Sequence, residues 1–470
     1  MFRRSSDKKP ALSKQELFAN TPVPKALYTM AIPTIISQMI NLIYNMVDSF
    51  FIGRTGNSYM MAATSLTLTL VMMNVAMSNL FGIGGGSLVA RLMGTRRFDD
   101  AKKVSAFSFY CAIGIALLYS LIIGVFLDPI LRVLGASDAT IGYARQYVLV
   151  VVVAGNLPVI LSQTVAHLLR NSGYSRQASI GLSGGGILNI LLDPLFMFVL
   201  LPQGMEVLGA AIATLLSNVA ACVYLLLTFR KVSKTAPLSF RPRDARAIEK
   251  QEIKSLFSVG IPSAALTALF DVANIFLNSL MSVHGDLELA AIGIVMKAER
   301  LPNAINIGLC QGMLPIVAYN YSSGNRERMN KVIRSVRIYG LVIAAVSLIL
   351  FEIFAAQIVR LFLSTSAGKV SDAVTTLGFA ALFLQIRCLA SISQFLNYHP
   401  SFCMQAVGNG RDTLIHSFCR ELVFYIPFMY LLNAMFGKVG LVCALVAGET
   451  CGAILALILF ARWKRKLSKT

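Results

Sequence analysis

The sequence is poor in charge for its length. Only 14% of its 470 residues are charged, whereas 56% are hydrophobic, and its mean hydropathy is +0.68. This composition excludes a soluble globular protein of that size. The apolar runs also lack the alternation with polar residues that is typical of transmembrane β-strands. We therefore expect an all-α integral membrane protein.

Signals of catalysis and of metal or nucleotide binding are lacking too. The eight cysteines, such as Cys222 and Cys310, lie mostly in apolar segments without metal-ligand spacing, which indicates reduced packing residues. The run Gly82–Ser87 lacks the lysine of a phosphate-binding loop and favours close helix packing. A membrane enzyme built around His399 stays an alternative, although no second catalytic group lies at a fixed spacing from it. We expect no catalytic residue, no metal site and no cofactor.

Apolar windows of about 20 residues recur along the chain, and roughly twelve of them can be read as membrane-spanning helices. The first residues, MFRRSSDKKPALSKQ, lack the apolar core of a cleavable signal. The 42 Lys and Arg residues gather in alternate loops between the windows. They lie in the amino-terminal tail and at Arg91–Lys103, Arg170–Arg176, Arg230–Lys254, Arg326–Arg334 and Arg462–Lys469. This positive-inside pattern predicts a multi-pass plasma-membrane protein with both termini in the cytoplasm, rather than a partner of nucleic acid.

The chain contains an internal repeat. The segment that starts at Ile32-Pro33 matches the one that starts at Ile261-Pro262, and SGYSRQ resembles the later VGNGRD. Equivalent positions coincide, namely Asn45 with Asn274, Gly56 with Gly285 and, after a slip of one residue, Gly94 with Gly324. An even number of helices in each half makes the two repeats parallel. The predicted parts are a cytoplasmic tail (1–25), an N-lobe of helices 1 to 6 (26–229), a basic cytoplasmic linker (230–254), a C-lobe of helices 7 to 12 (255–461) and a basic cytoplasmic tail (462–470).

The first predicted helix carries a carboxylate, Asp48, in an apolar run. Polar residues at three- and four-residue spacing form one stripe with it: Ser37, Asn41, Tyr44 or Asn45, and Asp48. An ionisable residue within a membrane is a functional candidate. It can take up and release a proton, because burial disfavours the charged form. The structural alternative is a pair with a cation or amide on a neighbouring helix.

The fifth predicted helix reads ILNILLDPLFMF and carries a second carboxylate. Asn189 and Asp193 are four residues apart and share one face, and Pro194 removes a backbone donor beside the acid. Two carboxylates and an amide can hold a proton or coordinate a small cation through oxygen. The alternative is a kinked helix whose aspartate only satisfies backbone groups that Pro194 leaves free.

The second half has a different set of polar residues. The candidates are Asp271, Asn274, Asn278, Lys297, Glu299, Arg300 and Asn303. Lys297 and Arg300 can pair with Asp271 or with Glu299, and Arg387 and Glu421 are further charged residues of this half. Three roles stay open for these charged residues: an ion pair that locks the two lobes together, a contact with substrate, or a purely structural role.

Three longer phrases carry a resemblance to a known family: QMINLIYNMVDSFFIGRTG, NILLDPLFMF followed by GAAIAT, and IGLCQGMLPIVAYNYSSGN. Over about residues 25 to 460 the chain resembles the multidrug and toxic compound extrusion (MATE) family, and within it the DinF-like bacterial branch. The resemblance implies a V-shaped pair of six-helix bundles. It also implies export of organic cations and other amphipathic compounds in exchange for protons or Na⁺.

The resemblance also assigns residues. Asp48 matches the family's first-helix acid, Asp193 and Asn189 match its fifth-helix acid and amide, and Thr214 matches a sixth-helix hydroxyl. Gln163 is the candidate on the fourth helix. Asp271 is one residue out of register with an acid of the sodium-linked NorM-like branch.

A flippase for a lipid-linked precursor, from the same superfamily, is the main alternative function. A flippase needs several cationic residues in the central cavity to hold pyrophosphate, whereas the candidate residues of the first lobe are acids and amides. The expected partners are small amphipathic or cationic substrates and membrane lipids, and the expected state is a monomer. Because the sequence offers no nucleotide site, we expect an ion gradient to supply the energy.

Overall fold

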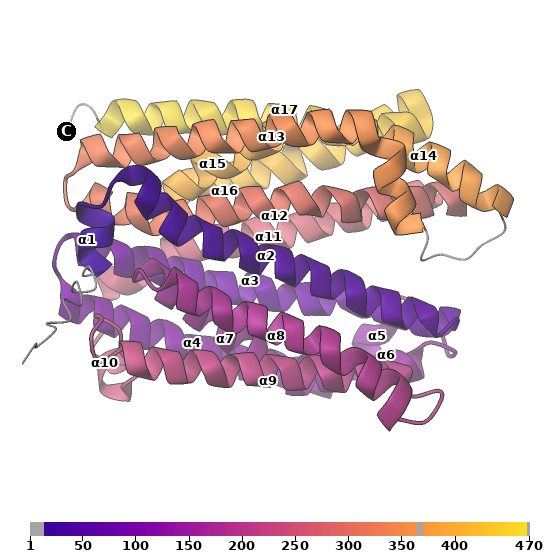
Figure 1. Ribbon diagram of the computed structural model, residues 1–470, viewed down its shortest axis with the longest axis horizontal. Coiled ribbons are helices and arrows are strands. Elements are labelled where there is room, and N and C mark those ends of the chain that lie inside the picture. Colours follow the sequence, from indigo (N-terminus) through magenta and orange to yellow (C-terminus); the bar gives the residue numbers. More distant parts are fainter. Residues whose placement is uncertain (1–13, 364–369, 468–470) are drawn as a thin grey trace, which may run out of the picture.

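The computed structural model describes residues 14–363 and 370–467, which form helices and no strands (Figure 1). The first half comprises α1 (Lys14–Ala19), α2 (Val23–Arg54), α3 (Ser58–Gly94), α4 (Phe98–Val125), α5 (Leu127–Val133), α6 (Ile141–Val148), the π-helical η1 (Leu149–Ala154), α7 (Asn156–Asn171), α8 (Ser175–Leu195), the π-helical η2 (Phe196–Leu200) and α9 (Glu206–Val232). After α10 (Pro242–Arg246), the second half comprises α11 (Lys250–Ser282), α12 (Asp286–Ser322), α13 (Arg326–Leu363), α14 (Val370–Cys388), α15 (Ser391–Val407), α16 (Gly410–Phe418), the π-helical η3 (Cys419–Tyr425) and α17 (Ile426–Leu467).

These helices make twelve membrane spans. Nine helices in the described part of the chain are long and apolar enough to cross a membrane, and two bent pairs, α6–α7 and α14–α15, add one span each. One of the nine, Gly410–Leu467, has 58 residues, which is about 87 Å at 1.5 Å per residue. It is divided at Gly437, where φ is 60° and ψ is −143°. Gly448 then packs against Tyr425, so the chain folds back and the run supplies two spans. The predicted number of helices is confirmed.

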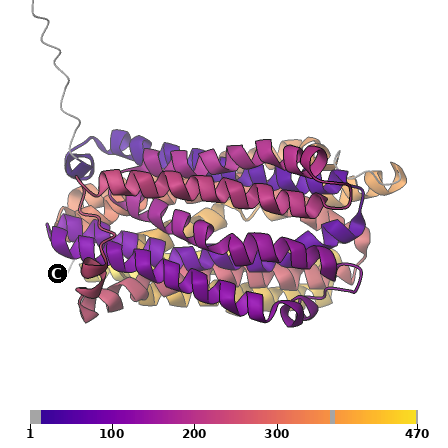
Figure 2. The same ribbon diagram turned by 90° about the horizontal axis from the view of Figure 1, so that it is seen from below.

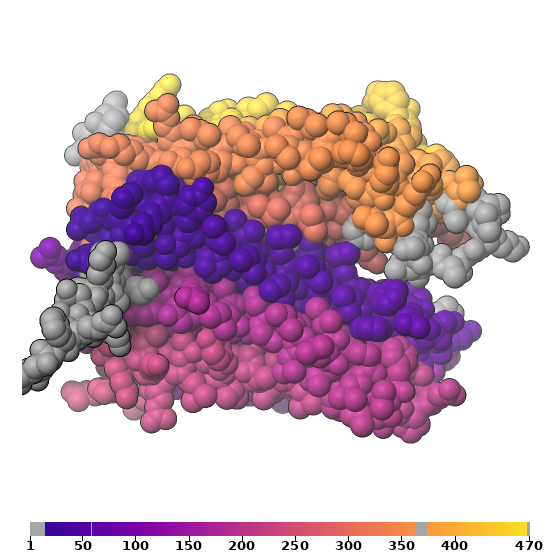
Figure 3. All heavy atoms as spheres, in the orientation of Figure 1, coloured from indigo at the N-terminus to yellow at the C-terminus, as the bar shows by residue number. Residues whose placement is uncertain are grey.

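The spans form two bundles, one of α2 to α9 and one of α11 to α17 (Figures 1 and 2). We call them the N-terminal and C-terminal bundles. They meet where α3 packs against α11 and α2 packs against α12. Figure 3 shows α2 against the C-terminal bundle near the chain termini and separating from it toward the other end of the molecule. The predicted V-shaped pair of bundles is confirmed.

Glycines allow the bundles to approach closely at the end near the termini. A Cβ on Gly84 would lie 2.8 Å from the carbonyl oxygen of Leu256, and one on Gly308 would lie 2.8 Å from Cα of Ile35. Within the same glycine-rich run, Gly82 packs against the ring of His167. The run Gly82–Ser87 therefore serves close packing, as predicted.

Glycines with positive φ end equivalent helices in the two halves. Gly56 and Gly285 have φ of 66° and 134°, and Gly173 and Gly408 have φ of 91° and 83°. These pairs fit the predicted repeat. In the turn that follows Gly94, the residue with positive φ is Arg96 (60°), whereas in the second half it is Gly324 itself (78°), and the match of Gly94 with Gly324 stays a prediction. Gly94 packs against Tyr319 and Ser322 of the other bundle.

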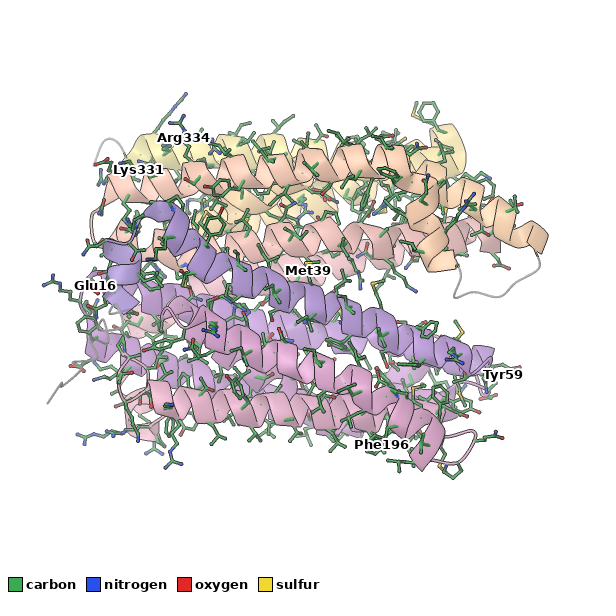
Figure 4. All side chains as sticks on the ribbon, viewed as in Figure 1. Glu16, Met39, Tyr59, Phe196, Lys331 and Arg334 are labelled. Carbon is green, nitrogen blue, oxygen red and sulfur yellow. The ribbon has the colours of Figure 1, made fainter. Side chains whose placement is uncertain are left out.

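The outer surface is apolar, as lipid requires. Large side chains such as Leu121, Leu191 and Ile353 are exposed on it. Figure 4 places Lys331 and Arg334 at the same end of the molecule as Glu16, and Tyr59 and Phe196 at the opposite end. The loops with many basic residues therefore gather at the end where the bundles touch.

Candidate functional site

A cavity of about 290 Å³ lies between the two bundles. Its polar lining comes from α2 (Gln38 and Asn41) and α7 (Gln163 and Arg170) on one side, and from Thr267, Gln311 and Arg420 on the other. Phe270 and Phe402 contribute to its apolar walls. Figure 4 shows Met39, the neighbour of Gln38, at the boundary between the bundles. We call this space the central cavity.

A smaller pocket of about 40 Å³ lies within the N-terminal bundle, among α2, α7, α8 and α9. It is lined by Asn41, Tyr44, Gln163, Asn189 and Thr214, among other residues. Asn41 and Gln163 also line the central cavity, so the two spaces adjoin. A Cβ on Gly186 would lie 3.0 Å from the Tyr44 ring, so this glycine allows α8 to pack closely against α2. We call this space the side pocket.

Asp193 lies on α8 one turn after Asn189, which lines the side pocket, and Asp193 is fully buried. The amide of Asn189 donates a hydrogen bond of 2.9 Å to Oδ1 of Asp193 and reaches Oγ1 of Thr214 at 3.4 Å. Oδ2 of Asp193 is buried without a hydrogen-bond partner among the described residues. Asp193 therefore does not serve to satisfy backbone groups beside Pro194, and one carboxylate oxygen is left for a proton or a cation.

Asp48 faces the same region from α2. Its Oδ1 is also buried without a hydrogen-bond partner in the described part of the chain, and it acts electrostatically on Asp193. Its neighbour Asn45 instead donates to the carbonyl and the side-chain oxygen of Asn41, at 2.7 and 2.9 Å. Neither aspartate forms an ion pair with a described residue. Hydrogen bonds thus join Asn189 to Asp193 and to Thr214, and Asp48 lies within electrostatic range of Asp193.

The candidates of the second half lie elsewhere. Neither the central cavity nor the side pocket is lined by Asp271, Asn274, Asn278, Lys297, Glu299, Arg300 or Asn303. Glu299 does not pair with Lys297 or Arg300. Its two oxygens accept from Nε and Nη2 of Arg387, at 2.8 and 2.9 Å. The expected pairing was wrong because α14 brings this arginine to α12 from 88 residues away in the chain.

A second buried network joins α15, α16, η3 and α17. Arg420 donates from Nε and Nη2 to the two oxygens of Glu449, at 3.1 and 2.5 Å. Asn397 donates to Oε2 of Glu449 at 2.6 Å, and its Oδ1 lies 2.9 Å from Nε2 of His416. Arg420 also lines the central cavity. Nothing in the sequence pattern indicated that this arginine lies at the cavity. His399 is fully buried, with Nε2 3.0 Å from the carbonyl oxygen of Ile333.

The distribution of basic residues along the sequence predicted the wrong location for Arg170. It was counted with the basic residues of a loop, but it lies in the last turn of α7, is 3% exposed and lines the central cavity. The signal available in the sequence was its position three residues after His167, which places both side chains on one helical face. Both residues line the cavity.

Comparisons with known proteins agree with this arrangement. The profile of the MatE family matches residues 33–195 and 262–431. The multidrug export protein MepA of Staphylococcus haemolyticus (strain JCSC1435) is 30% identical over 451 residues, which are 96% of each chain. MepA of Staphylococcus aureus (strain MRSA252) is 29% identical over 442 residues, 94% of each chain. The solved outward-facing structure of a multidrug resistance MATE family transporter of the MOP superfamily superposes with a TM-score of 0.89 at 23% identity, covering 98% of this chain and 100% of that one.

Proposed function

This chain belongs to the MatE family, a family of membrane transporters and not of enzymes, and on that premise we propose that it exports small amphipathic compounds, organic cations among them, by antiport with protons or Na⁺. The observation that carries the proposal is the pair of adjoining spaces. The central cavity has the position of a substrate site between two lobes, and the side pocket leads toward two carboxylates that have no cationic partner among the described residues.

The coupling ion binds, in this proposal, at Asp48 and Asp193, with Asn189 and Thr214 as neutral partners. Either a proton or a sodium ion neutralises one negative charge in a buried region, where an unpaired carboxylate is strongly disfavoured. One charge that moves inward across 100 mV supplies about 2.3 kcal/mol for export. Asn41, Tyr44 and Gln163 lie between this ion site and the substrate.

The sidedness follows from charge. The end of the molecule with basic loops faces the cytoplasm, together with both termini (1–25 and 462–470) and the linker 230–254. The N-lobe (26–229) and the C-lobe (255–461) are then closed toward the cytoplasm and separate toward the outside. Ion binding can reverse this arrangement only if the ion binds the two states unequally. We propose that the unit of transport is a monomer surrounded by membrane lipid.

The central cavity bears on the alternative of a lipid-linked-precursor flippase. That function needs several cations for a pyrophosphate group, and the cavity does contain Arg170 and Arg420. The charge of Arg420 is balanced by Glu449, which leaves one arginine. We therefore keep the export of small compounds as the proposal and the flippase as the alternative.

Transport by the full chain in liposomes tests the proposal. We expect an imposed pH gradient or an imposed Na⁺ gradient to drive movement of a fluorescent amphipathic dye. The variants Asp48→Asn and Asp193→Asn should lower gradient-driven transport to below about a tenth of the original rate, since each removes the charge that the ion neutralises.

Asp128→Asn is the matched control. It makes the same chemical change at an exposed acid that pairs with Arg145 outside the two spaces, and it should transport normally. Full activity of Asp48→Asn and Asp193→Asn would contradict the assignment of the ion site. Movement of a lipid-linked precursor in place of the dye would favour the flippase.

A further inference from the structure

Arg170 is a buried cation without an acidic partner. Its side chain makes two hydrogen bonds, both from Nη1, to Oε1 of Gln311 at 3.3 Å and to Nδ1 of His167 at 3.4 Å. Its Nε is buried and has no hydrogen-bond partner in the described part of the chain. No described Asp or Glu lies within ion-pair distance of it. A buried charge normally requires a counter-charge.

Two other buried arginines show what this group does elsewhere in the molecule. Arg387 binds Glu299 and Arg420 binds Glu449, and each uses Nε and Nη2 to hold both carboxylate oxygens. This edge of a guanidinium group can bind a carboxylate with two parallel hydrogen bonds. In Arg170 both hydrogen bonds come from Nη1, so this edge makes no hydrogen bond to a described residue.

The lining of the central cavity makes Arg170 its uncompensated charge. None of the residues that line the cavity is Asp or Glu. Of the two arginines there, Arg420 is balanced by Glu449. His167 accepts from Arg170 through Nδ1, which requires a neutral imidazole ring. Arg420 also lies 3.5 Å from Glu421, so Arg170 is the arginine of this lining that has no acid within ion-pair distance among the described residues.

We propose that the central cavity binds a small amphipathic monoanion and that Arg170 binds its carboxylate or sulfonate group. The inference rests on the proposed function, and among the amphipathic compounds proposed there it favours anions over organic cations as ligands of this cavity. Leu266, Phe270, Ile307 and Phe402 provide apolar contacts for the rest of the molecule. A single arginine without an acidic partner matches a monoanion, whereas a diphosphate brings at least two negative charges.

Equilibrium binding without a gradient tests the inference. The probes are dansylglycine, which is an anion, and dansylcadaverine, which is a cation with the same fluorophore. Each is titrated into the full-length protein in phosphatidylcholine nanodiscs, and the signal from empty nanodiscs is subtracted. We expect dansylglycine to bind at least about tenfold more tightly, as one hydrogen-bonded charge contributes. Equal binding of both probes, or tighter binding of the cation, overturns the proposal.

Variants assign the preference to Arg170. Arg170→Gln should remove the roughly tenfold preference, and Arg170→Lys should keep part of it because the charge stays but the planar fork is lost. Arg176→Gln is the matched control, since it removes the same charge at an exposed position of the next helix, and it should bind like the original protein. A preference that survives in Arg170→Gln overturns the assignment.

A second variant keeps the test decisive if Arg170→Gln does not fold. Gln311→Glu places an acid at the position that already accepts from Arg170, and this internal counter-charge should lower the affinity for dansylglycine by about tenfold. Unchanged affinity in Gln311→Glu contradicts the proposal. Geranyl diphosphate is a competitor that carries at least two negative charges. If geranyl diphosphate displaces dansylglycine at a concentration below the Kd of dansylglycine, the assignment to a monoanion is overturned.

The two proposals fail separately. The binding titration uses no ion gradient, so loss of the anion preference leaves the transport result for Asp48→Asn unaffected. Conversely, Asp48→Asn should still prefer dansylglycine even where gradient-driven transport is lost, because Asp48 does not line the central cavity.

Discussion

In the N-terminal bundle, Asp48 and Asp193 have no cationic partner among the described residues, whereas in the C-terminal bundle Glu299 and Glu449 each bind an arginine through both oxygens. The difference extends to the buried cations. Arg170 of the N-terminal bundle has only neutral partners, and Arg387 and Arg420 of the C-terminal bundle hold carboxylates. The two halves repeat one architecture but treat buried charge in opposite ways.

The comparison separates two uses of a buried charge. A buried charge that is paired with a side chain of the same protein always has its counter-charge. Such a pair holds helices together and does not need to bind an ion from solution. A charge without such a partner depends on an ion from solution, so its state varies with that ion. By this criterion we propose a structural role for the C-terminal pairs and a role in binding and coupling for the N-terminal charges.

The largest expected effect is on the stability of a C-terminal pair. Glu299→Gln leaves Arg387 buried without a counter-charge and should lower the free energy of unfolding by about 3 to 5 kcal/mol. Equilibrium denaturation in detergent micelles measures it. Glu327→Gln breaks an ion pair on the surface with Lys331 and should leave the free energy of unfolding unchanged. Equal stability of the two variants would contradict a structural role for the buried pair.

Replacing the whole pair should have a smaller effect than breaking it. In the double variant Glu299→Met with Arg387→Met, both desolvated charges are lost together, so the free energy of unfolding should stay within about 2 kcal/mol of the original. The same denaturation experiment on both single variants completes a double-mutant cycle. If the change in the free energy of unfolding of the double variant equals the sum of the two single changes, the side chains do not act as a pair. The structural role of the C-terminal pair would then be contradicted.

The N-terminal acids should respond in the opposite way. Asp193→Asn keeps an oxygen that accepts from Asn189 and removes a buried charge, so the free energy of unfolding should change by less than about 1 kcal/mol or should rise. Coupled transport should be lost in the same variant. Destabilisation as large as that of Glu299→Gln would show that Asp193 has a structural partner after all.

Much of the fold was predictable from the sequence because it depends on local patterns. Apolar length predicted the spans, and glycines at equivalent turns, such as Gly173 and Gly408, marked the repeat. Asp48, Asn189 and Asp193 were also identifiable as candidates, since polar residues in apolar helices must face protein or water, whereas Thr214 was a candidate only through the family resemblance. The pairing of Glu299 was not, because nothing in the sequence near it points to Arg387 on another helix. The loop pattern misplaced Arg170, since a basic residue near a helix end has the same appearance whether it faces lipid head groups or a cavity.

The smallest expected effect concerns Thr214, which lies at the edge of the N-terminal acids. Its hydroxyl is 3.4 Å from the amide of Asn189, a long hydrogen bond worth at most about 1 kcal/mol. Thr214→Val should therefore raise the ion concentration that gives half-maximal transport by about two- to fivefold, while Thr214→Ser, which retains the hydroxyl, should behave as the original protein. Transport assays over a series of ion concentrations measure this shift. If Thr214→Val instead abolishes transport as Asp193→Asn does, then the hydroxyl binds the ion directly, and the N-terminal ion site has one more ligand than its carboxylates and amide provide.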